Sequence, residues 1–178
     1  MKKIITISIL LLSIANAKAD GGSLWTIEYL PSSEYKSAIG FGIYGAKYDG
    51  IGYYGNFQLT ISTNEPHYES LNINSFGDPV TDRYEDLMIF NVGITKRISS
   101  VLGGYLGVGY AFVEGFAEKY DPYHILSSNG YYYVSDTAKD ESSGNVNAGI
   151  LLDAGSVTIN IGYHSFTSSA YFGIGGRF

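Results

Sequence analysis

The chain of 178 residues contains no cysteine. This absence excludes a disulfide framework, a thiolate nucleophile and a lipid-modified N-terminal cysteine. Beyond its first 19 residues the chain also lacks a long apolar run. A transmembrane helix needs about 20 mostly apolar residues, so any segment that crosses a membrane must do so as β-strands.

The N-terminus has the features of a secretory signal peptide. Lys2 and Lys3 precede an apolar run over residues 4–14, and small residues follow it as far as Ala19. The apolar run is too short for a membrane-spanning helix. We therefore expect export, with cleavage after Ala19 or, as an alternative, after Ala17.

Basic residues are scarce once the signal peptide is removed. Residues 20–178 hold eight Lys and Arg against 17 Asp and Glu, a net charge of −9. This balance disfavours a nucleic-acid partner. The same segment is rich in Gly and Tyr and poor in Lys, a composition that is unusual for a water-soluble surface.

Residues 20–178 show period-two alternation, which is typical of β-strands. In residues 157–165, Val157 and Ile159 point to an apolar face, whereas Thr158 and Asn160 point to a polar one. Eight segments share this pattern: residues 25–29, 39–44, 53–61, 88–95, 102–112, 145–153, 157–165 and 170–178. We expect each to form one strand.

Eight is an even number, which allows an antiparallel sheet to close without free edges. With the N-terminus taken as periplasmic, short turns are expected near residues 47–50, 99–100 and 154–155. The opposite end has long connections over residues 64–85 and 120–143, and shorter ones at 31–36 and 167–169. The sequence therefore predicts an all-β fold, an eight-stranded antiparallel up-and-down transmembrane β-barrel over residues 20–178, with residues 1–19 as signal peptide.

The long connection over residues 120–143 contains three consecutive tyrosines. The run Tyr131 to Tyr133 predicts either an extension of a hairpin above the membrane or a disordered loop.

Alternation alone does not say which face of the barrel is outside, because a soluble lipocalin-like barrel would hide its apolar face around a ligand. The polar face here is mostly uncharged, which suits a crowded interior and favours lipid outside. Aromatic residues near strand ends suit the membrane interfaces: Trp25, Tyr29, Tyr53, Tyr110, Phe112, Tyr163 and Phe172.

The C-terminal segment YFGIGGRF, residues 171–178, resembles the last strand of bacterial outer-membrane barrels, which ends in Phe. Phe172, Ile174 and Phe178 fall on one face, although Gly176 is a weak member of that row. The whole of residues 20–178 resembles the small OmpX/OmpA-type barrels. This resemblance implies location in the outer membrane of a Gram-negative bacterium, contact with lipid and lipopolysaccharide, and recognition of Phe178 by the barrel-assembly machinery.

Few charges are expected inside the barrel. They are Glu28, Arg97, Asp153 and Arg177, together with His164. Because an unpaired charge is costly in a narrow interior, we expect these residues to pair or to reach water near the ends. Eight strands enclose just enough room for their own side chains, so a large open pore is not expected. Lys96 and Arg97, before a predicted turn, mark the membrane interface.

Catalytic and metal sites find little support. His164 and Ser165 point to opposite faces of one strand, so the hydroxyl lacks a base unless His164 reaches Ser168 or Ser169. The acidic surroundings of His67 and His124, including Glu65, Glu69 and Asp121, are consistent with solvated loops or a loosely held cation. No dedicated metal-binding spacing is present. We therefore assign no catalytic, cofactor-binding or metal-binding residue.

Three functional hypotheses remain. The first is a non-enzymatic barrel whose long loops bind an extracellular ligand or stabilise the envelope, in adhesion or defence. The second is a lipid A-modifying enzyme that uses His164. The resemblance implies this possibility, because some small outer-membrane barrels modify lipid A. The third is a narrow channel for water or small solutes.

Overall fold

The computed structural model describes residues 22–32, 35–45, 47–60 and 67–178. The predicted signal peptide lies outside these residues. Eight strands form one body: β1 (Ser23–Leu30), β2 (Ala38–Gly45), β3 (Gly52–Thr60), β5 (Val80–Arg97), β6 (Leu102–Tyr120), β8 (Glu141–Asp153), β9 (Thr158–His164) and β10 (Ser169–Arg177). Two further strands extend this sheet at one end: β7 (Tyr131–Ser135) pairs with the outer part of β6, and β4 (His67–Asn72) pairs with β7.

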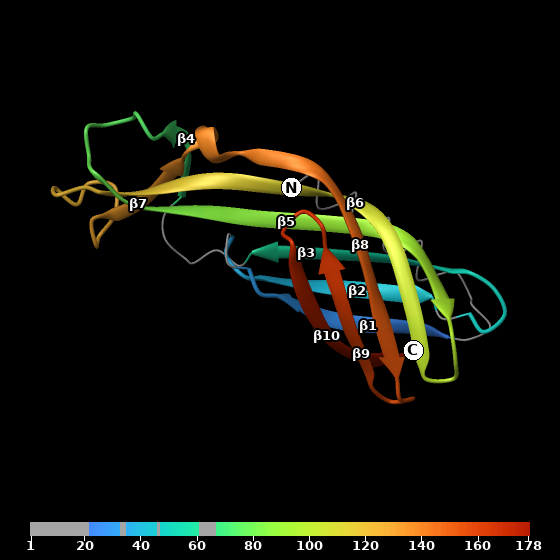
Figure 1. The fold of residues 1–178 in the computed structure, drawn as a ribbon. Coiled ribbons are helices and arrows are strands. Elements are labelled where there is room, and N and C mark those ends of the chain that lie inside the picture. Colours follow the sequence, from blue (N-terminus) through green and yellow to red (C-terminus); the bar gives the residue numbers. More distant parts are fainter. Residues whose placement is uncertain (1–21, 33–34, 46, 61–66) are drawn as a thin grey trace.

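The eight strands close into an antiparallel barrel (Figure 1). Neighbours run in the order β8, β9, β10, β1, β2, β3, β5 and β6, and pairing of β6 with β8 completes the ring. The first and last strands therefore meet, with Ile27 opposite Ile174. The fold predicted from the sequence is confirmed.

The two ends of the barrel differ. Short turns join β2 to β3, β5 to β6, and β8 to β9 at one end, which we call the turn end. Ser23 and Phe178 meet there through two backbone hydrogen bonds of 3.0 and 3.4 Å. The longer connections all lie at the opposite end, which we call the loop end. This arrangement agrees with the expected pattern of turns and loops.

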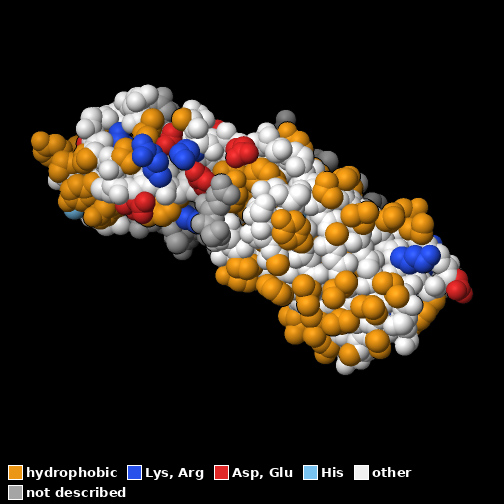
Figure 2. All heavy atoms as spheres, in the orientation of Figure 1, with side chains coloured by type: hydrophobic (Ala, Val, Ile, Leu, Met, Phe, Trp, Pro, Cys, Tyr) orange, Lys and Arg blue, Asp and Glu red, His pale blue; other side chains and the backbone are white. Residues whose placement is uncertain are grey.

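The predicted alternation sorts the side chains as expected. Val108 and Ile174 point outward and are 62% and 64% exposed, whereas Gln58 and Asn160 point inward and are fully buried. Figure 2 shows apolar side chains spread over the barrel surface. No helix in the described residues is long and apolar enough to cross a membrane. The exterior of the barrel is therefore apolar and its interior polar.

β5 and β6 extend far beyond the strands predicted for them. Residues 80–85, expected in a loop, belong to β5, and residues 141–143 belong to β8. Beyond the barrel, β6 pairs with β7, and β7 pairs in parallel with β4. The hairpin interpretation of Tyr131 to Tyr133 is thus confirmed. The charged residues of the extension hid it from the sequence pattern, because a strand in water tolerates charge.

Gly115 marks the point where β6 changes partner, from β8 to β7. A 3-10 turn, η1 (Thr137–Lys139), crosses β6 there, and the Asp136 N–H donates to the Gly115 carbonyl at 2.9 Å. A Cβ on Gly115 would lie 2.4 Å from Lys139 Cβ and 2.6 Å from Asp136 O. The crossing therefore needs a residue without a side chain.

Candidate functional site

The strands β4, β7, β6 and β5 form an outer sheet beyond the barrel at the loop end. It has its own apolar cluster, in which Tyr132 and Val134 are fully buried and Tyr68 packs against them. Tyr68 meets Tyr132 edge to face at 6.1 Å and donates a hydrogen bond to the Leu126 carbonyl at 2.6 Å. The outer sheet is therefore a packed structure that can hold its loops in place.

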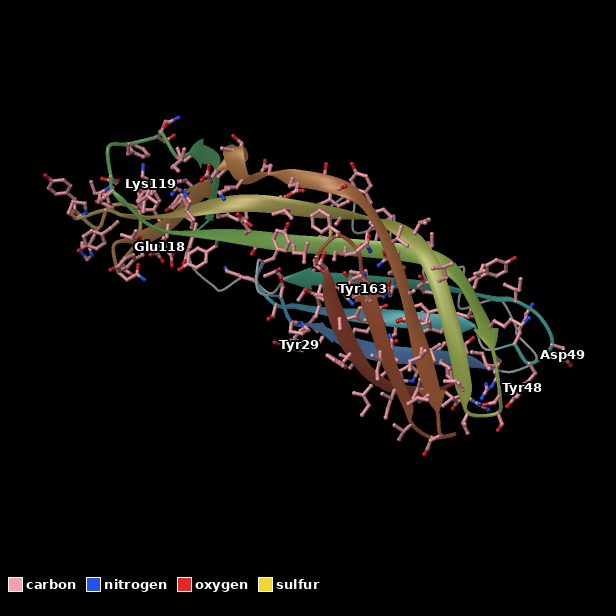
Figure 3. The ribbon with its side chains drawn as sticks, viewed as in Figure 1. Tyr29, Tyr48, Asp49, Glu118, Lys119 and Tyr163 are labelled. Atoms are coloured by element: carbon pink, nitrogen blue, oxygen red, sulfur yellow. The ribbon has the colours of Figure 1, made fainter. Side chains whose placement is uncertain are left out.

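Lys119, near the outer end of β6, organises the connection between β4 and β5. Its side chain is almost fully buried, and Figure 3 shows it within the outer sheet. The ammonium donates to three backbone carbonyls, those of Ile73 at 3.1 Å, Ser75 at 2.6 Å and Phe76 at 2.9 Å. Three converging carbonyls satisfy all the donors of a lysine. The loop is thus bound to the strand by one buried cation.

Asp121 organises the connection between β6 and β7, as an acceptor of backbone hydrogen bonds where Lys119 is a donor. Its carboxylate accepts the backbone N–H groups of Tyr123 at 2.8 Å, Ile125 at 2.6 Å and Leu126 at 3.0 Å. These bonds, led by that of Leu126, hold the pKa of Asp121 below its ordinary value. The backbone turns through His124, which has a φ of 54°. This left-handed conformation is uncommon for a residue with a side chain.

The two loops expose large apolar side chains, which we call the tip residues: Phe76, Tyr123 and Ile125. Their exposed fractions are 57%, 81% and 79%. Figure 2 shows apolar side chains gathered at the far end of the outer sheet, beyond the charged region. Phe76 has a φ of 55°, another left-handed position, and its carbonyl is one of those held by Lys119. The structure thus fixes the backbone and projects the apolar groups into solvent.

Acidic residues surround this region. The segments 65–86 and 114–141 contain 12 of the 17 Asp and Glu residues of the chain and three Lys or Arg. Lys119 is one of the three and is buried. The other two form ion pairs, Arg83 with Asp136 at 3.2 Å and Lys139 with Glu85 at 3.4 Å. Most of the acidic side chains therefore contribute an uncompensated negative potential.

The expected acidic clusters do not assemble into a metal centre. Among the described residues, no group of three or more His, Asp or Glu side chains could hold an ion. The oxygens of Asp121 are occupied by backbone N–H groups. Glu65 and the side chains of His67 and Glu69 lie outside the described part.

The middle of the barrel is built around Glu28. The expectation that this residue pairs with a cation or reaches water is wrong, since it is buried and its partners are neutral. Its carboxylate accepts five hydrogen bonds, from Tyr44 at 2.5 Å, Asn160 at 2.8 Å and Thr26, Asn56 and Gln58 at 2.9 Å each. These five donors satisfy the buried carboxyl group without a cationic partner.

Aromatic rings fill the lumen beside Glu28. Tyr44, Tyr54 and Tyr105 pack with ring centroids 5.0 to 5.3 Å apart, and the hydroxyls of Tyr105 and Tyr171 lie 2.7 Å apart. Glycine allows this packing, because a Cβ on Gly162 would lie 2.2 Å from the Tyr105 hydroxyl. These contacts leave little room for a passage through the middle of the barrel.

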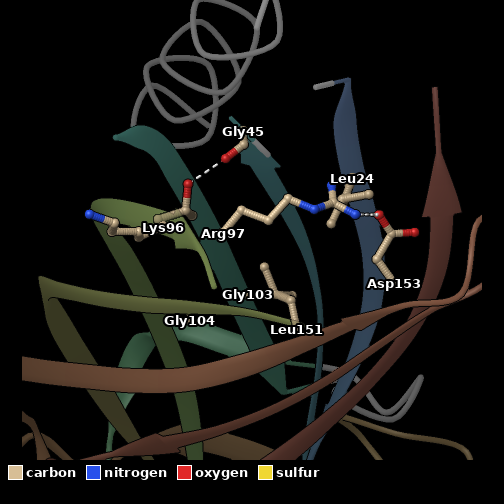
Figure 4. Close-up of a pocket in the computed structure, with 9 residues that line it drawn as sticks. Leu24, Gly45, Lys96, Arg97, Gly103, Gly104, Leu151 and Asp153 are labelled. Carbon is tan, nitrogen blue, oxygen red and sulfur yellow. Dashed lines mark hydrogen bonds and ion pairs between the residues drawn. The ribbon is translucent and has the colours of Figure 1, made fainter. Parts of the chain in front are cut away.

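At the turn end the expected ion pairs are confirmed. Arg97 donates to Asp153 at 2.6 Å, Arg177 donates to the same carboxylate oxygen, and Tyr48 stacks on Arg97 at 4.4 Å. Figure 4 shows the small cavity beside Arg97, with Leu24 and other residues around it. Its volume is about 20 Å³, room for one water molecule. This end is closed by a structural network.

His164 is part of the interior network. It is fully buried, stacks on Tyr171 at 4.3 Å, and bonds to Asn145 and Gln58, both at 3.0 Å. The alternative contact of His164 with Ser168 or Ser169 does not form, because the hydroxyls of both serines donate to backbone carbonyls. The Ser165 hydroxyl instead accepts the Val146 N–H at 2.8 Å. The imidazole therefore has no nucleophile to activate among these residues.

Closed antiparallel pairing, an apolar exterior and a polar, filled interior are together the geometry of a strand-built membrane protein. The fold is that of a small eight-stranded outer-membrane β-barrel. Solved structures with this architecture include Ail, the attachment invasion locus protein of Yersinia pestis, at 14% identity and a TM-score of 0.46, covering 88% of this chain and 95% of that one. Ail in complex with the heparin analogue sucrose octasulfate gives a TM-score of 0.48 at the same identity and coverage.

Neisserial surface protein A is similar at 9% identity and a TM-score of 0.42, covering 89% of this chain and 98% of that one. No protein-family model matches the sequence, and no curated protein matches it.

The sequence reasoning missed Lys119 and the clamping role of Asp121. One signal was present, because Ala111, Val113, Ala117 and Lys119 continue a single face of alternating positions beyond the predicted strand end. All four are buried. A longer window would have placed Lys119 in an interior, where a charge requires partners.

Proposed function

We propose that this protein is exported by residues 1–19, inserts into the outer membrane, and presents the tip residues to an extracellular partner in adhesion or defence. One observation carries the proposal: the side chains of Tyr123 and Ile125 are about four-fifths exposed, yet the backbone that bears them is held by hydrogen bonds to the Asp121 carboxylate. Binding loops that are already ordered lose less entropy on association, which favours affinity.

The orientation follows from the two ends. We place the turn end in the periplasm and the loop end outside, as in outer-membrane barrels with short periplasmic turns. The C-terminal strand β10 then ends at the periplasmic side, with Phe172, Ile174 and Phe178 all more than half exposed. We propose that the barrel-assembly machinery recognises this row, and that lipid and lipopolysaccharide surround the apolar band.

The chemistry of the tip favours a protein surface as partner. Aromatic and aliphatic anchors dominate protein interfaces when they enter an apolar pocket. The acidic surroundings of the tip favour a pocket rimmed by Lys or Arg and repel sulfated polysaccharides and anionic membranes. Association should therefore be fast at low salt and slower at high salt.

Binding of cells that carry the protein to immobilised serum and extracellular-matrix proteins tests this function. The test variant is Phe76→Ser, Tyr123→Ser and Ile125→Ser together, and the control is Val101→Ser, which alters an exposed apolar residue in the turn between β5 and β6 at the turn end. We expect attachment to fall by roughly tenfold or more in the triple variant alone. Equal attachment by wild type and triple variant, with both proteins heat-modifiable on gels, would refute the role of the tip.

The other two hypotheses receive less support. Burial of His164 within a neutral network argues against a lipid A-modifying reaction, and the tyrosines of the lumen argue against a channel. An envelope-stability role has a distinct signature. Cells lacking the protein would become sensitive to detergent, and the triple tip variant would restore resistance as well as wild type does.

A further inference from the structure

A groove lies on the outward face of the barrel near the turn end. Its walls are Ile51, Ile94, Ile98 and Leu106, and its volume is about 360 Å³. The four side chains are 46% to 67% exposed. Gly104 lies in the groove, and its missing side chain helps to keep it open. The groove is therefore an apolar depression in the outward face of the barrel.

The floor of the groove is open rather than tightly packed at Gly104. A Cβ placed there would lie 3.7 Å from Ile98 Cδ1 and 3.8 Å from the Gly149 carbonyl, which are ordinary contact distances. Most glycines on the inward face of the barrel are packed more tightly than the outward-facing Gly104. A Cβ on Gly107, for example, would lie 2.2 Å from the Tyr54 hydroxyl. A Cβ at position 104 therefore meets no clash, and a larger side chain there would fill the groove.

Lys96 borders the same groove. It alternates with Ile94 and Ile98 on the outward face and is exposed. Between the turns and the level of Met88, it is the one charged side chain on the outward face of the described barrel strands. Within the described chain its ammonium has no hydrogen-bond or ion-pair partner. A long basic side chain at such a position extends to the headgroup level of the membrane.

We propose that Lys96 and the groove form a binding site for a glycerophospholipid of the periplasmic leaflet. The Lys96 ammonium pairs with the phosphate, and one acyl chain lies along Ile51, Ile98 and Leu106. The charge of lysine suits a phosphate, which it binds as a point charge. The apolar walls supply binding energy in proportion to the chain area that they cover. This site does not involve the tip residues, and it rests on the proposed orientation, in which the turn end faces the periplasm.

Native mass spectrometry of the purified protein in detergent tests the site. The probes are phosphatidylglycerol, a diacylglycerol with the same chains, and glycerol phosphate, which has no chains. The variants are Lys96→Gln, Gly104→Leu and Lys96→Arg, and the control is Lys47→Gln, which removes another cation of the turn end. A gel-mobility shift on heating checks that each variant is folded.

We expect wild type and Lys47→Gln to bind phosphatidylglycerol at least about fivefold more tightly than the diacylglycerol. Lys96→Gln should lose this preference, Lys96→Arg should keep it, and Gly104→Leu should weaken both lipids. If Gly104→Leu does not fold, Ile98→Gln serves in its place, because it makes one wall polar.

Several results would overturn the site. They are an unchanged preference in Lys96→Gln, an equal loss in Lys47→Gln, and wild-type affinity in the groove-filled variant. Binding of glycerol phosphate as tight as that of phosphatidylglycerol would also overturn it, because the site would then recognise free phosphate and not a lipid.

Discussion

Lys119 and Asp121 lie two residues apart at the outer end of β6, and each binds a different loop with the opposite hydrogen-bonding polarity. The lysine binds only carbonyls, those between Ile73 and Phe76. The aspartate binds only N–H groups, those between Tyr123 and Leu126. One short stretch of chain at the end of β6 thus orders both loops that bear the tip residues.

Replacement of Lys119 by Met tests the first clamp. The methionine retains most of the apolar stem but leaves three carbonyls without a donor, and hydrogen bonds to a charged group contribute about 1.5–3 kcal/mol. We expect faster proteolysis within residues 73–79 and an unchanged heat-dependent gel shift of the barrel. Equal proteolysis of variant and wild type would show that the loop is ordered by other contacts.

The second clamp should depend on pH. The pKa of Asp121 in the folded protein lies below its ordinary value. The stabilisation of the loop by the ionised carboxylate is therefore complete above the ordinary pKa, and it is lost as the pH falls through the lower pKa of the folded state. The amide resonances of Tyr123 and Ile125 should therefore stay constant at neutral pH and shift only in acid, below about pH 4. Asp121→Asn provides the control, because its spectrum should lack this acid transition.

Two glycines of neighbouring segments offer a matched pair of substitutions. Gly115→Ala places a methyl group 2.4 Å from Lys139 Cβ, whereas a Cβ on Gly144 meets no atom within 4 Å. We expect Gly115→Ala to loosen η1, increasing cleavage near residues 136–140, with Gly144→Ala unchanged. Similar cleavage of the two variants would contradict the packing requirement at Gly115.

Glu28 should stabilise the barrel despite the absence of a cationic partner. Glu28→Ala removes the acceptor of five hydrogen bonds, and we expect the free energy of unfolding to fall by at least about 3 kcal/mol. Urea titration in lipid vesicles, followed through the single tryptophan Trp25, measures the change. Ile27→Ala, at a neighbouring outward position, should cost less, and the reverse order would be evidence against the network.

The tyrosines inside the barrel predict electrical silence. Because Tyr44, Tyr54 and Tyr105 pack across the lumen, the purified protein in a planar bilayer should conduct no more than the protein-free bilayer. Discrete conductance steps that scale with protein concentration would contradict this result.

The barrel was largely predictable from the sequence because the period-two alternation indicates which residues of each strand point outward and which point inward. Segments such as residues 157–163 alternate strictly, and the structure buries His164 and Asn160 as that alternation requires. The signal weakens beyond the membrane, where both faces of β5 and β6 meet water or loops. Arg83 and Glu85 therefore resemble loop residues although they belong to a strand.

The binding features of the loops were not predictable for a different reason. The contacts of Lys119 and Asp121 are to backbone groups, which carry no residue-specific signal. Similarly, the sequence indicated that Glu28 would be inside, but the five neutral donors come from β1, β2, β3 and β9, and only the register of the closed sheet brings them together. Arg97 and Asp153 were expected to pair or to reach water because an unpaired charge is costly in the interior, and the structure pairs them with each other.

The continuity of β5 and β6 has a mechanical consequence. Both strands run without interruption from the turn at one end of the barrel to the outer sheet at the other. A partner that pulls on the tip therefore applies tension along these strands. The hydrogen bonds that join β5 to β3 and β6 to β8 are perpendicular to the strands, so the pull shears many of these bonds at once instead of opening them one by one. A cell held by this protein in flowing liquid would be anchored through the stiffest direction of its fold.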